Sequence, residues 1–387
     1  MSIVTDAVTT AADVLAAIEQ LAPTIAGRAS EIEEARRLPA DLLDELKTAG
    51  AFRLTRPDSH GGVGADLPSA MRVFEALARA DASVGWTVMI GGASWPDLAG
   101  LPRPTFDSIF GAGPDVVIAG AINPTGSVEA VDGGYRVTGR WAFVSGCEHA
   151  DWLYGDCLEG IVDGVPQLRI ALFTPDQVVI EDTWTVSGLR GTGSHHIRVD
   201  GVVVAPERTL LVFDEAPCVD EPAVRIPPPS LYSCCLAVLA VGIAQGALDD
   251  IVGLATHKVP LLAGAPLATS PSFQFDLATA DAELRAARAL AYETAATVWA
   301  RGVEGIEPTL LESARVRAAA VWATDAAARV VDTAYRSGGG SSVYATCPLQ
   351  RRLRDIHAVT QHFLVRRDTM TTAGAILAGN EVDVMLF

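Results

Sequence analysis

The sequence predicts a mostly helical α+β protein in which a β domain lies between two helical regions. Helical periodicity occupies residues 1–112, and long alanine-rich helical patterns occupy residues 226–387. Between them, residues 113–215 contain short β-branched and aromatic runs separated by turn signals. Because no helical pattern separates these runs, they favour an antiparallel barrel or sandwich over a parallel α/β unit.

In the N-terminal region, apolar residues recur at helical spacing from Leu15 to Ile25, with Pro23 expected to break or kink this helix. Pro39 begins a helix that ends at Gly50, and two further helices are predicted over Leu67–Ala80 and Ser83–Trp95. The predicted strands are Val116–Ala121, Tyr135–Phe143, Trp152–Leu158, Leu168–Phe173, Val178–Trp184 and Ile197–Val204.

The C-terminal region predicts a four-helix bundle, with helices at about 230–257, 271–301, 308–336 and 348–379. In the last of these, apolar residues repeat at steps of three and four. At about 100° per residue, Asp355 and His362 share one edge of that helix, and His357 lies on the opposite flank. We expect the chemistry at the edge that carries Asp355 and His362.

The composition limits the classes of molecule that the protein is expected to bind. A net charge of −18 disfavours nucleic acids and anionic membranes, both of which would repel the protein. No stretch is interpreted as a membrane span, and the first 20 residues lack a basic signal-peptide start, so a cytoplasmic protein is expected. The six cysteines form no Cys-x-x-Cys pair and are interpreted as reduced thiols, and no spacing indicates a metal site.

Two motifs of the β domain each have a structural and a functional interpretation. Gly188–Ser194 is glycine-rich and carries Arg190, Thr192 and Ser194; it is either a plain β-turn or a loop that binds phosphate. Trp141-Ala-Phe143-Val-Ser145-Gly146 is either a half-buried strand or an aromatic surface for a conjugated ring, with Ser145 bonding a ring heteroatom.

The order of domains resembles that of the acyl-CoA dehydrogenase superfamily, and within it the two-component flavin-dependent monooxygenases. The resemblance covers the whole chain and rests on five segments. They are Phe52-Arg-Leu…Gly61-Gly62, Ala82-Ser-Val-Gly-Trp86, Trp141-x-Phe-x-Ser-Gly146, Gly188-Leu-Arg-Gly-Thr-Gly-Ser194 and Pro348-Leu-Gln-Arg-x-x-Arg354-Asp355.

His362 separates the two branches of the superfamily. The resemblance implies that a dehydrogenase would carry its catalytic glutamate shortly after Arg354-Asp355, where this chain has His362 and Phe363, or near Cys235. Without either carboxylate, no base for α-proton abstraction is evident. The resemblance also implies that the monooxygenases have a histidine eight residues after this arginine, and His362 has that position relative to Arg354.

The resemblance implies an oxygenase component that receives reduced FMN or FAD from a separate flavin reductase. Oxygen adds to the flavin to give a C4a-(hydro)peroxyflavin, which oxygenates an aromatic or polycyclic natural-product intermediate. Catalytic roles are implied for His362 and Ser145, and substrate contacts for Trp86 and Ser94. An imidazole pKa near neutrality would suit His362 to manage a proton or to polarise the substrate. The implied cofactor-binding residues are Trp141, Phe143, Ser145, Gly146, Arg190, Thr192, Gly193, Ser194, Gly339, Ser341 and Arg354.

Two positions depart from the family pattern. Ser94 stands where the phenol hydroxylases carry a histidine, which disfavours a simple phenol as substrate. Pro260–Gly264 lacks the arginine that grips the FAD pyrophosphate in the dehydrogenases, which favours FMN or a loosely held reduced flavin. Gly339 and Ser341 are implied to reach a neighbouring subunit's flavin in a homotetramer. The alternatives are an acyl-CoA dehydrogenase-type flavoenzyme and a flavin-free cyclase or binding scaffold.

Overall fold

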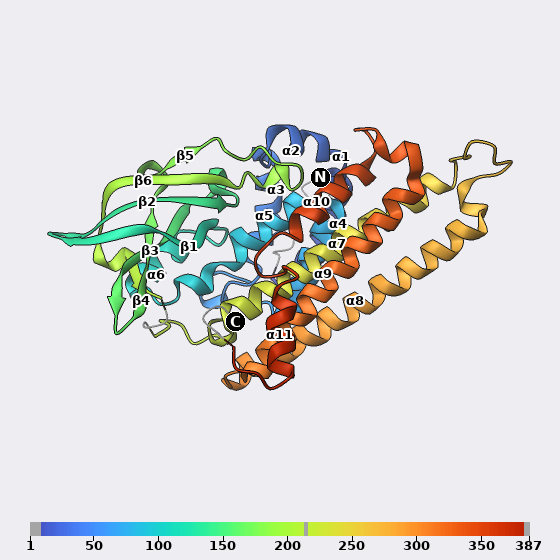
Figure 1. The fold of residues 1–387 in the computed structure, drawn as a ribbon. Coiled ribbons are helices and arrows are strands. Elements are labelled where there is room, and N and C mark those ends of the chain that lie inside the picture. The colour runs from blue at the N-terminus through green and yellow to red at the C-terminus, as the bar shows by residue number, and fades with distance from the viewer. Residues whose placement is uncertain (1–8, 213–215, 383–387) are drawn as a thin grey trace.

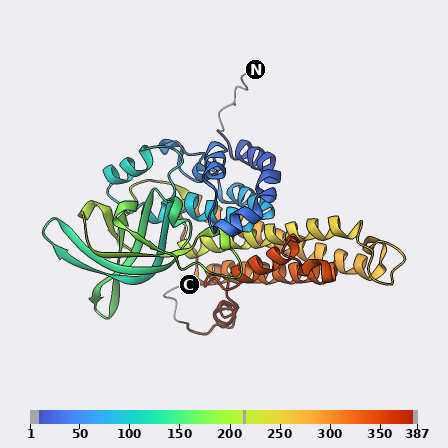
Figure 2. The same cartoon turned by 90° about the horizontal axis from the view of Figure 1, so that it is seen from above.

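The computed structural model describes residues 9–212 and 216–382. The N-terminal helices and a β-sheet both pack against a bundle of long helices, with the sheet at one end of the bundle (Figure 1). Figure 2 shows the N-terminal helices covering the part of the bundle next to the sheet. The predicted order of helices, sheet and helices is therefore confirmed.

The N-terminal region contains the helices α1 (Ala11–Gly27), α2 (Ala29–Ala35), α3 (Ala40–Thr48), α4 (Leu67–Ala80), α5 (Ala82–Ala93) and α6 (Arg103–Gly111). Pro23 lies inside α1 without ending it. The helix α5 is buried almost all round, because it lies between α4, α7 and the sheet. Its first turn is capped by the Asp81 carboxylate, which accepts from the backbone N–H groups of Ser83 and Val84.

The described strands form one seven-stranded sheet in the order β5-β6-β2-β1-β3-β4-β7. The strands are β1 (Ile118–Val131), β2 (Gly134–Val144), β3 (Trp152–Val162), β4 (Val165–Phe173), β5 (Val179–Glu181), β6 (His195–Val204) and β7 (Thr209–Leu211). The expectation of a wholly antiparallel sheet is wrong at one pair, since β1 and β3 run parallel. β2 returns along one side of β1, and the chain then places β3 along the other side in the direction of β1.

The bundle consists of α7 (Pro228–Ala255), α8 (Pro271–Glu304), α9 (Leu310–Gly338) and α10 (Pro348–Val359), followed by the short α11 (Thr369–Leu377). The prediction of one continuous last helix is wrong, because α10 ends at Val359. Leu364 and Val365, which lie beyond that end, are both buried. The chain forms successive turns there instead, including His362 N–H to Val359 O at 3.0 Å.

The interpretation that no segment is long and apolar enough to span a membrane is also wrong. The helix α7 meets both criteria, with a mean hydropathy of 1.9 over its most apolar window. In the folded chain 89% of that window is buried, as in the core helix of a globular bundle. Cys234 and Cys235 belong to this buried surface.

Candidate active site

The end of β2 carries an exposed aromatic ring. A β-bulge between Trp141 and Val144 inserts one extra residue opposite β6, which re-aims the side chain of Phe143. Phe143 has a φ of 64°, uncommon for a bulky residue, and its side chain is 70% exposed. Trp184 and His196 meet its ring edge-on at centroid distances of 6.2 Å each.

Beyond this ring, buried hydroxyl groups form a hydrogen-bonded chain. The indole N–H of Trp86, on α5, donates to Ser145 Oγ at 3.0 Å. Ser145 Oγ lies 2.8 Å from Ser194 Oγ, which lies 2.7 Å from Thr192 Oγ1. The structure thus unites Trp86, Ser145, Thr192 and Ser194. The Ser194 hydroxyl contacts Ser145 and Thr192, and the Thr192 hydroxyl contacts Ser194 and the Leu189 carbonyl. A contact of either residue with a cofactor phosphate stays a prediction.

The loop Gly188–Ser194 is held from behind by α10. The backbone N–H of Leu189 donates to Asp355 Oδ1 at 2.7 Å across 166 residues of sequence. A Cβ at Gly188 would lie 2.1 Å from the Arg354 carbonyl oxygen, so only glycine permits this approach. Burial, together with the charge of Asp81, raises the pKa of Asp355 to about 7. Asp355 therefore supports the loop and does not share a helical edge with His362.

Two glycines fit the loop to its surroundings. Gly146 has a φ of 71°, and its N–H donates to Thr192 O at 2.8 Å, which joins the end of β2 to the loop. Gly193 has a φ of 51°, and a Cβ there would lie 2.9 Å from the Arg36 carbonyl oxygen. Both glycines therefore serve the backbone geometry beside Ser145.

His362 lies in the turn after α10 and packs against Trp86. The two rings meet edge-on with centroids 5.6 Å apart, so His362 and the hydroxyl chain belong to one site. Burial, with a smaller contribution from the charge of Arg317, lowers the pKa of His362 to about 4. The expectation of a pKa near neutrality is therefore wrong. Nδ1 accepts the Leu364 N–H at 3.3 Å, so the neutral ring carries its proton on Nε2.

Trp141 is a core residue. Its ring has no exposed surface, packs against Phe173 and donates its N–H to Asp156 O at 2.7 Å. A Cβ on Gly126, Gly139 or Gly155 would lie between 2.3 and 2.5 Å from this ring, so these glycines make room for it. The Trp141 ring therefore offers no exposed surface to a cofactor, whereas the bulge exposes the ring of Phe143.

Arg354 and Arg190, the two arginines predicted to bind the cofactor, both lie close to the carboxylate of Glu33. Arg354 bonds the Glu33 carboxylate and, at 2.6 Å, the carbonyl of Ser187, while Arg190 lies 3.8 Å from Glu33. Glu33 therefore offsets part of their charge. A contact of either arginine with a cofactor phosphate stays a prediction.

Gly339 and Ser341 lie away from Ser145. Ser341 Oγ accepts from Lys258 Nζ at 3.0 Å, and Lys258 follows α7 in the connection to α8. Figure 1 shows that connection at the end of the bundle away from the sheet. Their contribution to a neighbouring subunit's site stays a prediction.

Ser94 belongs to a polar cluster that the sequence did not reveal. Its hydroxyl donates to Ile90 O at 2.6 Å and lies 3.2 Å from the hydroxyl of Tyr232. Asp97 accepts from Tyr232 at 2.7 Å and from Tyr154 at 3.1 Å. Burial raises the pKa of Asp97 to about 6, against the lowering effect of the two tyrosine hydrogen bonds. Asp97 follows α5 by four residues, and spacing alone does not indicate that Tyr154 and Tyr232 meet it.

The remaining unassigned histidines have structural partners. His149 Nε2 accepts from the Leu38 N–H at 3.2 Å. His195 Nδ1 accepts from the N–H groups of Thr183 and Trp184, both at 3.2 Å. His357 pairs with Asp332 at 2.9 Å, on the bundle surface.

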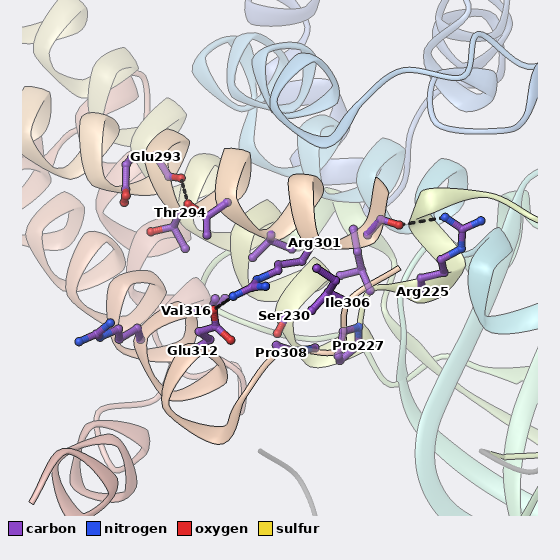
Figure 3. Close-up of a pocket in the computed structure, with 15 residues that line it drawn as sticks. Arg225, Pro227, Ser230, Glu293, Thr294, Arg301, Ile306, Pro308, Glu312 and Val316 are labelled. Carbon is purple, nitrogen blue, oxygen red and sulfur yellow. Dashed lines mark hydrogen bonds and ion pairs between the residues drawn. The ribbon is translucent and has the colours of Figure 1, made fainter. Parts of the chain in front are cut away.

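A separate pocket of about 220 Å³ lies between the start of α7 and the facing ends of α8 and α9 (Figure 3). Arg301 bonds Glu312 across it, and Arg225 donates to the Gly302 carbonyl at 3.1 Å. No predicted site residue lines this pocket. The candidate active site is therefore elsewhere, around Ser145 and His362.

The domain order and this site define an acyl-CoA dehydrogenase-type fold. Residues 14–96 match the family described as "Acyl-CoA dehydrogenase, N-terminal domain", and residues 234–367 match "Acyl-CoA dehydrogenase, C-terminal domain". The crystal structure of 3-HSA hydroxylase from Rhodococcus sp. RHA1 superposes with a TM-score of 0.86 at 29% identity, covering 96% of this chain and 98% of that one.

Two relatives indicate the enzyme class to which the chain belongs within this fold. The indole-3-acetate monooxygenase of Pseudomonas putida is 34% identical over 354 residues, which span 92% of this chain and 90% of the relative. The FADH(2)-dependent resorcinol hydroxylase, oxygenase component, of Rhizobium sp. is 31% identical over 89% of this chain and 88% of the relative. The chain belongs to the oxygenase components of flavin-dependent monooxygenases. The predicted fold class, enzyme class and use of reduced flavin with O₂ are confirmed.

The residues present fit a flavin. Phe143 offers an exposed ring, at the end of β2, that a flat heteroaromatic ring system can cover. Ser145 lies two residues further along the chain, and its oxygen has acceptor capacity left after the Trp86 bond. Phe143 and Ser145 would therefore hold the ring face and a ring heteroatom, respectively.

Proposed function

We propose that this oxygenase takes reduced flavin from a separate reductase and inserts one oxygen atom of O₂ into an aromatic substrate. The hydrogen bond from Trp86 to Ser145, with His362 packed on the same indole, carries this proposal. These contacts bring a hydroxyl, an aromatic ring and a neutral imidazole close together. The naming of relatives as oxygenase component or subunit supports a partner that supplies the flavin.

Bound reduced flavin supplies the electrons that activate O₂. The protein side chains orient and polarise the reactants. With its proton on Nε2, His362 donates a hydrogen bond to an oxygen atom at the reacting centre. Its pKa of about 4 makes it a weak base that is neutral at pH 7, which suits it to donate a hydrogen bond to this oxygen better than to remove a proton.

The walls around His362 favour an aromatic substrate. Trp86 meets His362 edge-on, and the ring of Phe363 also contacts the imidazole, with centroids 4.8 Å apart. Aromatic rings pack well in such surroundings, with offset and edge-on contacts worth about 0.5–1.5 kcal/mol each. Two relatives are named for aromatic compounds, indole-3-acetate and resorcinol.

A homotetramer would bury the exposed apolar groups at the far end of the bundle. Leu261 and Leu262 are 93% and 99% exposed in the connection between α7 and α8. Val343 and Tyr344 are each 70% exposed in the segment that follows Ser341. Contact between subunits through these residues would carry Gly339 and Ser341 to a neighbouring site.

The test is to supply FMN or FAD, chemically reduced, with ¹⁸O₂ and a panel of indole and phenol substrates. One labelled oxygen atom in the product supports the proposal. Reduction of bound flavin by a saturated acyl-CoA, with no reductase present, would support the dehydrogenase alternative. Failure to bind either flavin at micromolar concentration would support a binding scaffold.

A further inference from the structure

We propose that Thr192 and Ser194 fix the direction of the Ser145 hydroxyl, so that the site binds reduced flavin in preference to oxidised flavin. The proposal rests on the flavin site proposed above. It assigns these residues a positioning role, because neither side chain is exposed to a ligand.

The direction of these hydrogen bonds is set at Thr192, which is the end of the hydrogen-bonded chain farther from the proposed flavin site. Thr192 Oγ1 donates to the Leu189 carbonyl at 2.9 Å, which uses its one proton. Ser194 must then donate to Thr192, across 2.7 Å, because Thr192 has only acceptor capacity left. By the same reasoning Ser145 donates to Ser194 across 2.8 Å.

At the near end, Ser145 Oγ already accepts the Trp86 N–H at 3.0 Å. Its proton is directed at Ser194, so towards a ligand it offers only a lone pair. The N5 atom of a reduced flavin carries hydrogen and can donate to that lone pair. The N5 atom of an oxidised flavin has no hydrogen, and two facing lone pairs repel.

The hydrogen-bonded chain could run in the opposite direction only if Thr192 gave up its hydrogen bond to the Leu189 carbonyl. The Leu189 carbonyl accepts from Trp184 Nε1 at 3.0 Å and from the Thr192 N–H at 3.2 Å, so it stays hydrogen-bonded without the Thr192 hydroxyl. If Thr192 donated to Ser194, and Ser194 to Ser145, the Ser145 proton would become available to an oxidised flavin. The Thr192–Leu189 hydrogen bond therefore determines the preference.

Two variants release this constraint by different routes. Ser194→Ala removes the acceptor of the Ser145 proton, and Thr192→Val removes the group that accepts from Ser194. In both, Ser145 is free to donate, so affinity for oxidised flavin rises relative to reduced flavin. Losing one buried hydrogen bond at the site corresponds to a change on the order of tenfold. Thr192→Ser keeps the hydroxyl and should restore the wild-type ratio.

The experiment measures anaerobic dissociation constants of reduced and oxidised FMN and FAD by fluorescence, with circular dichroism to verify folding. The matched control is Thr324→Val, which removes a buried hydroxyl that has no hydrogen-bond partner among the described residues. A tenfold change in the ratio of the constants also shifts the bound flavin's two-electron potential by about 30 mV.

We expect the oxidised-to-reduced ratio of constants to fall about tenfold in Ser194→Ala and Thr192→Val, and to stay at the wild-type value in Thr192→Ser and Thr324→Val. If the wild type binds flavin and either folded variant keeps its ratio within about twofold, the positioning role is refuted. If Ser194→Ala does not fold, the ratio measured for Thr192→Val is enough to support or refute the positioning role. If the wild type binds neither form of flavin, the proposed function fails as well.

Discussion

Replacing His362 by phenylalanine separates its hydrogen bond from its packing. Phenylalanine keeps an aromatic ring against Trp86, where the imidazole centroid lies 5.6 Å away, but it has no Nε2–H donor. Losing one donor aimed at a reacting oxygen costs about 2.7–4 kcal/mol, or about 10²–10³ in kcat. Reduced-flavin affinity should change little, since the hydroxyl chain at Ser145 is intact. His362→Gln, which retains an N–H, should recover part of the loss.

The assay is single-turnover product formation with pre-bound reduced flavin, between pH 5.5 and 8. Because burial lowers the pKa of His362 to about 4, the wild-type profile should show no limb from this residue in that range. The same shift makes folding stability full above the unfolded pKa of about 6.5 and lower as pH falls towards 4. A limb near pH 6.5 that disappears in His362→Gln would show that His362 titrates as a base. Wild-type rates in His362→Phe would exclude the hydrogen bond.

Two further predictions follow from strain and from burial. Phe143→Gly relieves strain of about 1 kcal/mol at a φ of 64°, but it removes the ring contacts with Trp184 and His196 and adds entropy to the unfolded chain. The free energy of unfolding, measured by urea denaturation, should therefore change by less than about 1 kcal/mol. Flavin affinity should fall in a titration because the ring is lost, and equal flavin affinity would remove Phe143 from the site. Burial raises the folded-state pKa of Asp97 to about 6, so the wild type should lose stability as pH rises from about 4 to 6. Asp97→Asn should not show this loss. Parallel curves of stability against pH for the two proteins would contradict the prediction.

The sequence predicted most of the long helices, because apolar residues recur in them at helical spacing. It failed where burial does not follow a period. The period of apolar residues runs on to Phe363, but α10 ends at Val359 and His362 lies in the turn after it. In β2, strict alternation places Trp141 and Phe143 on one face, but the bulge exposes Phe143 and leaves Trp141 in the core. One inserted residue in a strand cannot be read from alternation.

The sequence named the residues that meet around Ser145, but not how they contact one another. Thr192 and Ser194 lie in a glycine-rich loop that could equally bind a phosphate, and only the fold shows that Ser194 bonds Ser145 and that Thr192 bonds Ser194. The lowered pKa of His362 arises mainly from burial by segments distant in sequence. The sequence did not indicate the cluster around Asp97, because its two tyrosine partners lie on β3 and α7.

The hydrogen bond from Leu189 to Asp355 also has a consequence for how the protein acquires its site during synthesis. The loop that anchors the hydroxyl chain is translated 166 residues before the carboxylate that holds it. A nascent chain with a complete sheet therefore lacks the support for its own flavin loop. Competence to bind cofactor should appear only after α10 has emerged and docked, so reduced flavin cannot assist the earlier stages of folding.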